Sequence, residues 1–422
     1  MRIVFYSSNS NVFDDKTFII SVMPQNAKSF SDFTASHPEH EFFCVTQKPA
    51  MFMPEQEASL TNVIYLSQAA DTNLFSDEII KLKPDLAIAM TFWVEPYDWL
   101  TVSDSLVAQK LNEKGINTIC HSVECGLICF DKWRTHNELK RLGFNVPAAV
   151  FCDHDLYFCA GSNKEVLQNV YKQSVLNQIT SLKLPLIIKD TTGLSSYGMT
   201  VAHTYGEVTG YLNSKRNNSN RIIQEFISGR QFGLEIYGVP GAYTVLPPFE
   251  FTINQYGITS PKQSAKYGPC ELPEELKKMM LELAQGLGLC GVAQVDLILD
   301  SEGSWHIIEI NPRLSGMTFT YAAACGLSVF EMIYRSCVQK KPLPELSCDV
   351  MSIKLPLMTK AEMQDLMKID GVCLLNQSND LAAKQEREKG FCECITAGVK
   401  PVPSELKQKL SGLENCHLPP SF

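Results

Sequence analysis

Residues 295–318 read VDLILDSEGSWHIIEINPRLSGMT and are the most informative part of the chain. Two apolar runs, Ala293–Leu299 and Ser304–Ile310, are separated by Asp-Ser-Glu-Gly at positions 300–303. Short apolar runs on either side of a polar, glycine-containing turn are typical of a β-hairpin. The sequence therefore predicts two antiparallel strands here, the second of which leads directly into Asn-Pro-Arg at positions 311–313.

Polar side chains interrupt this apolar hairpin. Because side chains alternate with a period of two along a strand, Glu309 and Asn311 share one face, and Asp296 on the paired strand can point to the same side. Two carboxylates and an amide oxygen form a hard oxygen site of the kind Mg²⁺ prefers, with Mn²⁺ as an alternative. A solvated sheet face is the other interpretation. Three isoleucines flank Glu309, however, and a polar group on such a core strand needs a partner.

The first 125 residues alternate short apolar runs with longer mixed segments. Helical periodicity fits the segments near Ser76–Leu82 and Ser103–Glu113. The expected strands are Arg2–Tyr6, Glu41–Thr46, Asn62–Leu66, Asp85–Met90 and Asn117–His121. Such alternation predicts a parallel, doubly wound sheet. No GxGxxG follows the first strand, where residues 7–11 read SSNSN, so a dinucleotide site and a dehydrogenase function are unsupported.

A second region begins near Asp131 and contains two well-marked helices. Lys132–Leu142 is amphipathic, and Pro273–Gly288 carries apolar residues at helical spacing, with two acids in its first turn and a glycine at its end. Leu184–Lys189 reads as an apolar strand that ends in a polar, glycine-containing loop, 190–198. Three further strands are expected to form one antiparallel sheet: Arg221–Phe226, Gly233–Tyr237 and Tyr243–Leu246.

Taken in order, these segments resemble the ATP-grasp superfamily of carboxylate–amine ligases. FDKWRTHNELKRLGFNVP at 130–147 resembles the helix that begins with a nucleotide-phosphate lysine. LPLIIKDTTGLSSYGM at 184–199 is similar to the second lysine strand with its phosphate loop, and residues 295–318 look like the metal-binding hairpin. The resemblance covers roughly residues 120–340 and is closest to D-alanine–D-alanine ligase, biotin carboxylase and the L-amino-acid and dipeptide ligases.

The resemblance implies a multidomain α/β and α+β chain with the ATP-grasp fold. Four units are expected: an N-terminal Rossmann-like parallel-sheet domain at 1–124, ATP-grasp subdomain A at 125–226, subdomain B with the metal site at 227–341, and a small β-rich C-terminal extension at 342–422. A linker rich in lysine and proline at residues 340–344 precedes the extension.

The resemblance also assigns residues that hold ATP. Lys132 and Lys189 would contact its phosphates, and a loop would close over them. The loop residues are Gly193, Ser195, Ser196 and Gly198. The chemistry agrees, because a lysine at the end of a buried strand aims its ammonium into a cleft, and glycines let backbone N–H groups approach phosphate oxygens closely. Read alone, the segment also fits a surface loop after an edge strand.

RIIQEFISG at 221–229 resembles the strand that links the two ATP-grasp halves and holds adenine. The residues placed there are Gln224, Glu225, Phe226 and Ile227. The Ile227 N–H and Glu225 are the expected adenine contacts, with the register open by one residue. The chain departs from the family where an acid usually binds the ribose, because Gln231 stands there. A glutamine can still accept a hydrogen bond from a hydroxyl, and Glu235 is the alternative.

Three residues are assigned to the reaction itself. Lys266, within SAKYG, is similar to the D-alanine–D-alanine ligase lysine that meets the γ-phosphate, and Ser196 lies in the phosphate loop. Arg313 resembles the arginine of the biotin carboxylase-like branch, which can form a bidentate pair with a carboxylate or an acyl phosphate. Residues 315–318, Ser-Gly-Met-Thr, form a turn that could bind the acceptor substrate.

Composition narrows the class of partner. The 422 residues carry a net charge of −9 and no cluster of lysine and arginine, which argues against a nucleic-acid surface. No apolar run reaches the roughly 18 residues of a membrane span, and the N-terminal apolar run is too short for an export signal. A cytoplasmic protein is therefore expected, and its 15 cysteines should be reduced. Cys120, Cys125 and Cys129 near His121 lack zinc-site spacing, which favours buried thiols over a metal site.

The resulting hypothesis is an ATP-dependent ligase that joins a carboxylate, expected to be an amino acid, to an amine. The resemblance implies an acyl-phosphate intermediate and release of ADP and phosphate. Two alternatives stay open: a carboxylase-type ATP-grasp enzyme, and a nucleotide-binding regulatory protein without turnover. The substrates are expected to be small molecules, and a homodimer is compatible with the resemblance. The sequence identifies no general base.

Overall fold

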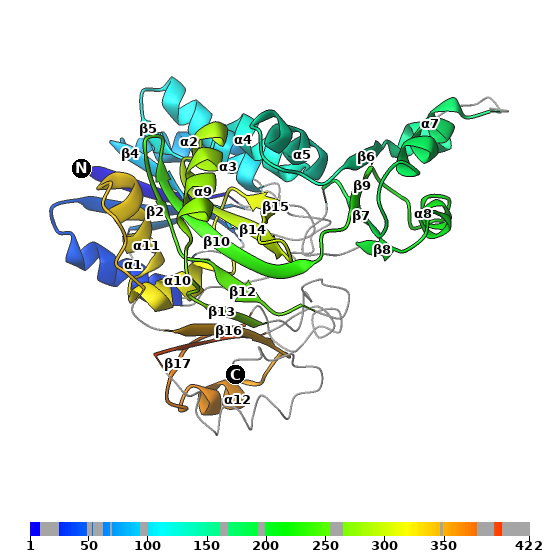
Figure 1. The fold of residues 1–422 in the computed structure, drawn as a ribbon. Helices are drawn as coiled ribbons and strands as arrows, with labels where there is room; N and C mark the ends of the chain where they lie inside the picture. Colours follow the sequence, from blue (N-terminus) through cyan, green and yellow to red (C-terminus); the bar gives the residue numbers. More distant parts are fainter. Residues whose placement is uncertain are drawn as a thin grey trace.

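The structure is a computed structural model of the 422-residue chain. The residues it describes are 1–8, 25–48, 53, 62–67, 70–92, 100–160, 168–192, 199–253, 265–346, 349–377 and 392–398. Three sheets organise these residues: a parallel sheet of five strands, an antiparallel sheet of four and a sheet of nine (Figure 1).

The N-terminal sheet is parallel, with strand order β3-β2-β1-β4-β5. Its strands are β1 (Arg2–Ser7), β2 (Glu41–Gln47), β3 (Val63–Leu66), β4 (Leu86–Ala89) and β5 (Asn117–Ile119), and its helices are α1 (Gln25–Ser36), α2 (Thr72–Lys81) and α3 (Leu100–Glu113). Alternate residues of β1 bury both faces: Ile3 and Phe5 pack toward α1, whereas Val4 and Tyr6 pack toward α2 and α3. The predicted parallel, doubly wound sheet is confirmed.

The four-stranded antiparallel sheet has the order β6-β9-β7-β8. Its strands are β6 (Ala149–Cys152), β7 (Leu186–Asp190), β8 (Thr200–Ala202) and β9 (Arg221–Glu225), with helices α6 (His154–Phe158), α7 (Val170–Ile179) and α8 (Tyr205–Leu212). Two helices, α4 (Val123–Phe130) and α5 (Lys132–Arg141), connect it to the first domain. One sequence expectation is wrong: strand 221–226 lies in this sheet as β9, whereas the strands at 233–237 and 243–246 belong to the larger one. A strand's local pattern does not reveal its partners.

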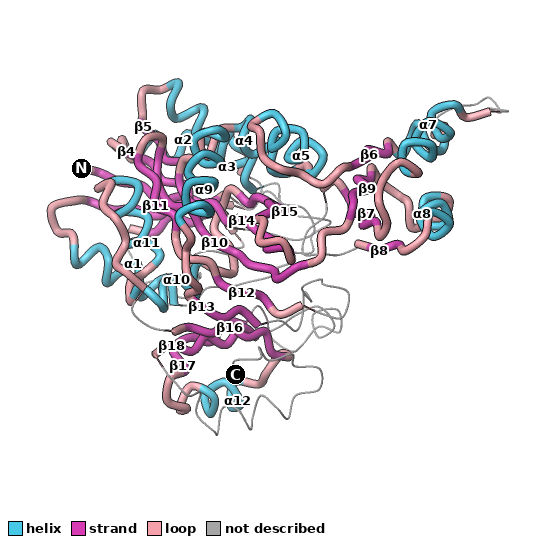
Figure 2. Tube along the Cα trace, viewed as in Figure 1, coloured by secondary structure: helices cyan, strands magenta, loops and turns pink. Residues whose placement is uncertain are grey.

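The large sheet runs β15-β14-β10-β12-β13-β16-β18-β17, with β11 paired to β10. Its strands are β10 (Gly229–Val239), β11 (Ala242–Val245), β12 (Phe249–Phe251), β13 (Ala265–Gly268), β14 (Gly291–Asp300), β15 (Trp305–Asn311), β16 (Val350–Leu355), β17 (Val372–Gln377) and β18 (Cys392–Ala397), with α12 (Lys360–Leu366) after β16. The β-rich C-terminal extension is confirmed. Because β13 and β16 pair directly, the extension continues the central sheet instead of forming a sheet of its own (Figure 2).

Helix α9 (Glu274–Leu287) covers one face of the large sheet. Pro273 caps its start, acids occupy its first turn, and Gly288 ends it with a positive φ of 60°, as the sequence predicted. Its apolar stripe packs against alternate residues of β10 and β14, including Phe232, Leu234 and Val295. The remaining side chains of these strands must therefore face away from α9.

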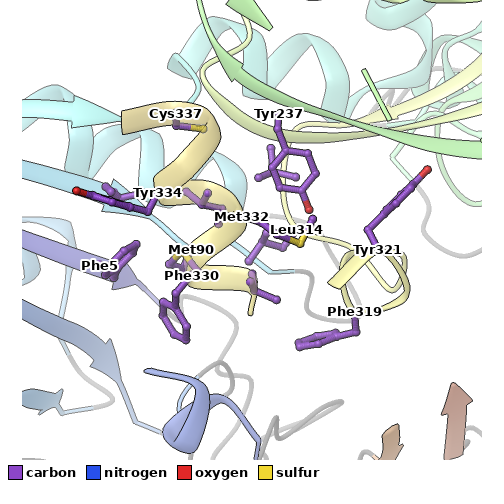
Figure 3. Packing of buried hydrophobic residues seen from close by; sticks show 14 of the residues in the cluster. Phe5, Met90, Tyr237, Leu314, Phe319, Tyr321, Phe330, Met332, Tyr334 and Cys337 are labelled. Atoms are coloured by element: carbon purple, nitrogen blue, oxygen red, sulfur yellow. The ribbon is translucent and has the colours of Figure 1, made fainter. Parts of the chain in front are cut away.

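A hydrophobic cluster joins the N-terminal domain to the segment that follows β15 (Figure 3). That segment contains α10 (Thr318–Cys325), α11 (Val329–Ile333) and a π-helical turn, η1 (Tyr334–Val338). Phe330 of α11 meets Phe5 of β1 edge-on at 5.3 Å, and the Leu314 N–H donates to the Thr91 carbonyl at 2.9 Å. The chain after Arg313 is therefore fixed against the N-terminal sheet.

Among the described residues, no helix combines the length and apolarity needed to cross a membrane.

Replacing Leu283 by Ala tests how strongly α9 supports the large sheet. Leu283 is fully buried, so its loss should reduce the free energy of unfolding by about 2–5 kcal/mol. Urea denaturation would measure the change. Leu74→Ala is the matched control, because Leu74 is 44% exposed on α2 and its truncation should change stability by less than about 0.5 kcal/mol. Equal effects of the two changes would contradict this packing.

Candidate functional site

The register of the β14–β15 hairpin places the predicted metal ligands together. Asp296 lies opposite Glu309, and Gln294 lies opposite Asn311. The β10 residues paired with this part of β14 are Gly233 and Glu235. All of these positions alternate with the residues packed under α9, so they lie on the opposite face of the large sheet.

The four-stranded sheet supplies the opposite wall. Leu186 and Ile188 of β7 are buried toward α7 and α8, so Lys189 points from the other face. Gln224 of β9 shares that face, because it pairs with Ile187. Lys132 starts α5 beside this strand, and its backbone N–H donates to the Thr191 carbonyl at 2.7 Å. Both predicted phosphate lysines therefore come from elements anchored to the same sheet.

The two walls meet at an ion pair. Lys132 Nζ lies 3.0 Å from Glu309 Oε1, with both side chains largely buried. Burial alone would raise the pKa of Glu309, but the charge of Lys132, with smaller contributions from Arg313 and Lys189, lowers it. Burial and then the repulsion of Lys132 lower the pKa of Lys189 to about 8. Two lysines thus face one acid, an excess of positive charge suited to phosphate.

The two acids differ in pKa, which is raised for Asp296 and lowered for Glu309. Burial, reinforced by the negative charge of Glu309, raises the pKa of Asp296 to about 7. The Gln294 Nε2 donates to its Oδ1, the Asn311 Nδ2 donates to Gln294 Oε1 at 2.8 Å, and Arg313 Nη2 donates to Asn311 Oδ1 at 3.0 Å. This chain of hydrogen bonds orders the whole row. Gln294 was missed by the sequence analysis, although its position two residues before Asp296 could have revealed it.

The donor set fits a hard divalent cation. Two carboxylates and an amide oxygen converge from neighbouring strands, and a cation between them would relieve the repulsion that raises the pKa of Asp296. Within the described ranges, no group of three or more His, Cys, Asp or Glu side chains could hold a metal, and this site offers two such acids together with the amide of Asn311. Cys120, Cys125 and Cys129 form no disulfide there; Cys125 and Cys129 are buried, and Cys120 is half-buried.

Several polar groups of the predicted adenine strand already have hydrogen-bond partners within the protein. The Glu225 N–H donates to the Ala148 carbonyl at 3.0 Å, and the Phe226 N–H donates to the Pro185 carbonyl at 3.0 Å. Glu225 Oε1 accepts from the Lys183 N–H at 2.8 Å, so this carboxylate holds the preceding loop. Gln224 Nε2 lies 3.3 Å from His136 Nδ1. The Ile227 N–H stays the predicted adenine contact.

Glu235 does not replace the ribose-binding acid. It is fully buried and accepts hydrogen bonds from Ser315 Oγ at 2.8 Å, Thr318 Oγ1 at 2.7 Å and the Tyr237 hydroxyl at 2.7 Å. Gln231, four residues earlier on the same strand, stays the predicted ribose ligand. The hydroxyls of the predicted acceptor turn are therefore used to hold Glu235, which leaves Gly316 as the part of the turn nearest to Lys266.

Lys266 of β13 lies beside the turn that contains Gly316. A Cβ atom built on Gly316 would lie 3.3 Å from Lys266 Nζ, which places the ammonium against the turn. The structure thus brings residues together from five elements and from the segment after β15: Lys132, Lys189, Lys266, Asp296, Glu309, Asn311 and Arg313. The loop residues Gly193, Ser195, Ser196 and Gly198 lie outside the described residues.

Comparison with known proteins identifies the architecture. A model of the ATP-grasp domain family matches residues 129–317. D-alanine–D-alanine ligase of Buchnera aphidicola subsp. Schizaphis graminum is 30% identical over 223 residues, which are 49% of this chain and 68% of that protein. The chain belongs to the ATP-grasp family.

Solved structures extend the similarity of the fold to almost the whole chain. An L-amino acid ligase from Bacillus licheniformis aligns with a TM-score of 0.63 and 14% identity, covering 97% of this chain and 95% of that one. The biotin carboxylase domain of the Hydrogenobacter thermophilus 2-oxoglutarate carboxylase, solved as a dimer with MgADP, ADP and bicarbonate, aligns at 0.61 and 12% identity over 98% and 90%. The expected ATP-grasp fold, including the N-terminal domain and the extension, is confirmed.

Replacing Glu235 by Gln should change how stability depends on pH. Burial raises the folded-state pKa of Glu235 from 4.5 to about 7. Between these values the folded chain keeps a proton that the unfolded chain loses, so stability falls as pH rises. Urea unfolding at about pH 5 and about pH 7.5 should show a smaller loss in the variant than in the wild type. Asp296 titrates in both proteins, so its effect cancels in the difference. Parallel losses would contradict the buried-carboxylate description.

Proposed function

We propose that this protein is an ATP-dependent ligase that activates a carboxylate, expected to be that of an amino acid, and joins it to an amine. The observation that carries the proposal is the meeting of the two lysines with the paired acids, in which Lys132 Nζ lies 3.0 Å from Glu309. Lysines from α5 and β7 and carboxylates from β14 and β15 together provide both halves of a site for a metal–nucleoside triphosphate.

The proposed chemistry divides the work among the residues of the two walls. Lys132 and Lys189 hold the ATP phosphates, while Asp296, Glu309 and Asn311 hold Mg²⁺. When bound by these residues, Mg²⁺ would supply positive charge that neutralises the transferring phosphoryl group. The substrate carboxylate attacks the γ-phosphorus in line, the bond to the ADP oxygen breaks, and ADP is released.

The second half of the reaction forms the amide bond. Arg313, ordered by its bond to Asn311, holds the acyl phosphate. A neutral amine attacks its carbonyl carbon, the carbon–oxygen bond to phosphate breaks, and inorganic phosphate leaves. The amine loses one proton in the process. The sequence analysis expects the loop at 190–198 to close over the phosphates and exclude the water that otherwise hydrolyses an acyl phosphate; residues 193–198 lie outside the described residues.

A carboxylase-type ATP-grasp reaction is the second candidate. The biotin carboxylase domain shares the fold over nearly the whole chain, and bicarbonate is itself a carboxylate that could take the γ-phosphate. A nucleotide-binding protein without turnover is disfavoured, because Asp296, Glu309, Asn311 and Arg313 are all retained and are ordered by mutual contacts.

Nucleotide turnover distinguishes these functions. The purified chain, supplied with Mg-ATP and pooled amino acids, should release ADP only when the pool is present. Mass spectrometry of the same samples should show a product equal to two components minus water. ADP formation that depends on bicarbonate instead would support the carboxylase-type reaction. AMP and pyrophosphate as the products would contradict acyl-phosphate chemistry.

Replacing Glu309 by Gln tests the predicted metal site. The change removes a charged ligand and the partner of Lys132 while keeping the shape of the side chain, so kcat should fall about 10²–10³-fold with the fold intact. Turnover would be measured beside circular dichroism. Glu302→Gln, the same change at an exposed position in the turn of the same hairpin, is the control and should leave turnover unchanged. An active Glu309→Gln variant would remove Glu309 from the metal site.

A further inference from the structure

The C-terminal extension reaches the candidate site through one residue, Glu393 of β18. Lys266 Nζ lies 3.4 Å from Glu393 Oε1, and the pair is largely buried, with side chains 12% and 5% exposed. The Ser352 hydroxyl of β16 donates to the same Glu393 oxygen at 2.5 Å. A buried carboxylate, itself fixed by a hydroxyl, thus contacts the lysine predicted to meet the γ-phosphate.

The alternation of the extension's strands explains why Glu393 points this way. Met351 and Ile353 of β16 and Cys392 and Cys394 of β18 are buried in the extension's own core with α12. Residues between them must lie on the opposite face, and Glu393 is flanked by the two cysteines. Lys266 pairs with Ser352 in the adjoining strands, so these polar side chains lie on the same face of the continuous sheet.

Lys266 lies on the same face of the continuous sheet as Asp296. Lys266 pairs with Phe251 and Phe251 pairs with Gln231, while Gly233, two residues further along β10, pairs with Asp296. The ammonium therefore lies on the face that carries a candidate metal ligand. A lysine that paired with Asp296 would compete there with a divalent cation.

We propose that Glu393 is a positioning residue that holds the Lys266 ammonium against the Gly316 turn and away from Asp296, so that Asp296 stays available to a divalent cation. The C-terminal extension is then part of the catalytic apparatus. This inference rests on the proposed function, because it assumes that Asp296 and Lys266 serve the same metal–nucleotide.

Three variants test the idea: Glu393→Gln, Lys266→Met and the double variant. The glutamine keeps the shape of the side chain and can still accept from Ser352. In Glu393→Gln, the Mg²⁺ concentration for half-maximal binding of a non-hydrolysable ATP analogue should rise about tenfold, equivalent to 1.4 kcal/mol. In the double variant it should return to the value of Lys266→Met, because the competing ammonium is gone. Turnover of the double variant should equal that of Lys266→Met.

Glu271→Gln is the matched control, since Glu271 is exposed shortly after β13 and should leave Mg²⁺ dependence unchanged. Ser352→Ala should shift the dependence in the same direction as Glu393→Gln but less, and it serves if the latter fails to fold. An unchanged dependence, or a double variant worse than both single ones, would overturn the positioning role. The binding measurement needs no catalysis, so it gives a result even if the protein forms no product. A protein that binds Mg-nucleotide but forms no product would contradict the ligase proposal alone.

Discussion

The pairing of Asp296 with Glu309 is the constraint on which the rest of the site depends. Neighbouring antiparallel strands leave opposed side chains about 4.5–5.5 Å apart at Cβ, so two buried carboxylates in this register repel each other. Neighbouring cationic side chains offset this repulsion. Lys132 pairs directly with Glu309, and Arg313 donates a hydrogen bond to Asn311 beside them. A hairpin that carried these acids without such neighbours would be costly to bury.

The neighbours are supplied by parts of the chain that lie far apart in the sequence. Lys189 comes from the sheet whose own core lies under α7 and α8, and Lys132 comes from α5, which is hydrogen-bonded to the end of that sheet's β7 segment at Thr191. Lys266 comes from β13 and pairs with Glu393 of the extension. The segment after Arg313 is fixed to the N-terminal sheet by the Thr91–Leu314 hydrogen bond and by the Phe5–Phe330 contact. Residues from each of these parts of the chain therefore contribute to one site or support it, which is the physical reason to assign a single reaction to it.

Much of this architecture follows from local patterns. The sequence predicts the hairpin, the five N-terminal strands, and α9 with its proline and glycine ends. These could be predicted because hydrophobic periodicity and capping residues are properties of consecutive residues. Strand partners could not: β9 was assigned to the wrong sheet, and nothing local showed that β13 pairs with β16. The same limit applies to the site. The alternation of β14 and β15 predicts Asp296, Glu309 and Asn311 on one face. In contrast, Glu393 contacts Lys266 across 127 residues of chain, and two of the hydroxyls that bond Glu235, those of Ser315 and Thr318, lie 80 and 83 residues away.

Locating the metal and the nucleotide together would test the central claim most directly. A crystal of the chain with Mn²⁺ and a non-hydrolysable ATP analogue, measured at the manganese absorption edge, would give an anomalous peak for the cation. The account predicts that this peak lies among the oxygens of Asp296, Glu309 and Asn311, with the analogue's phosphates between it and the ammonium groups of Lys132 and Lys189. A nucleotide bound elsewhere, or bound here with its metal away from these three residues, would contradict it.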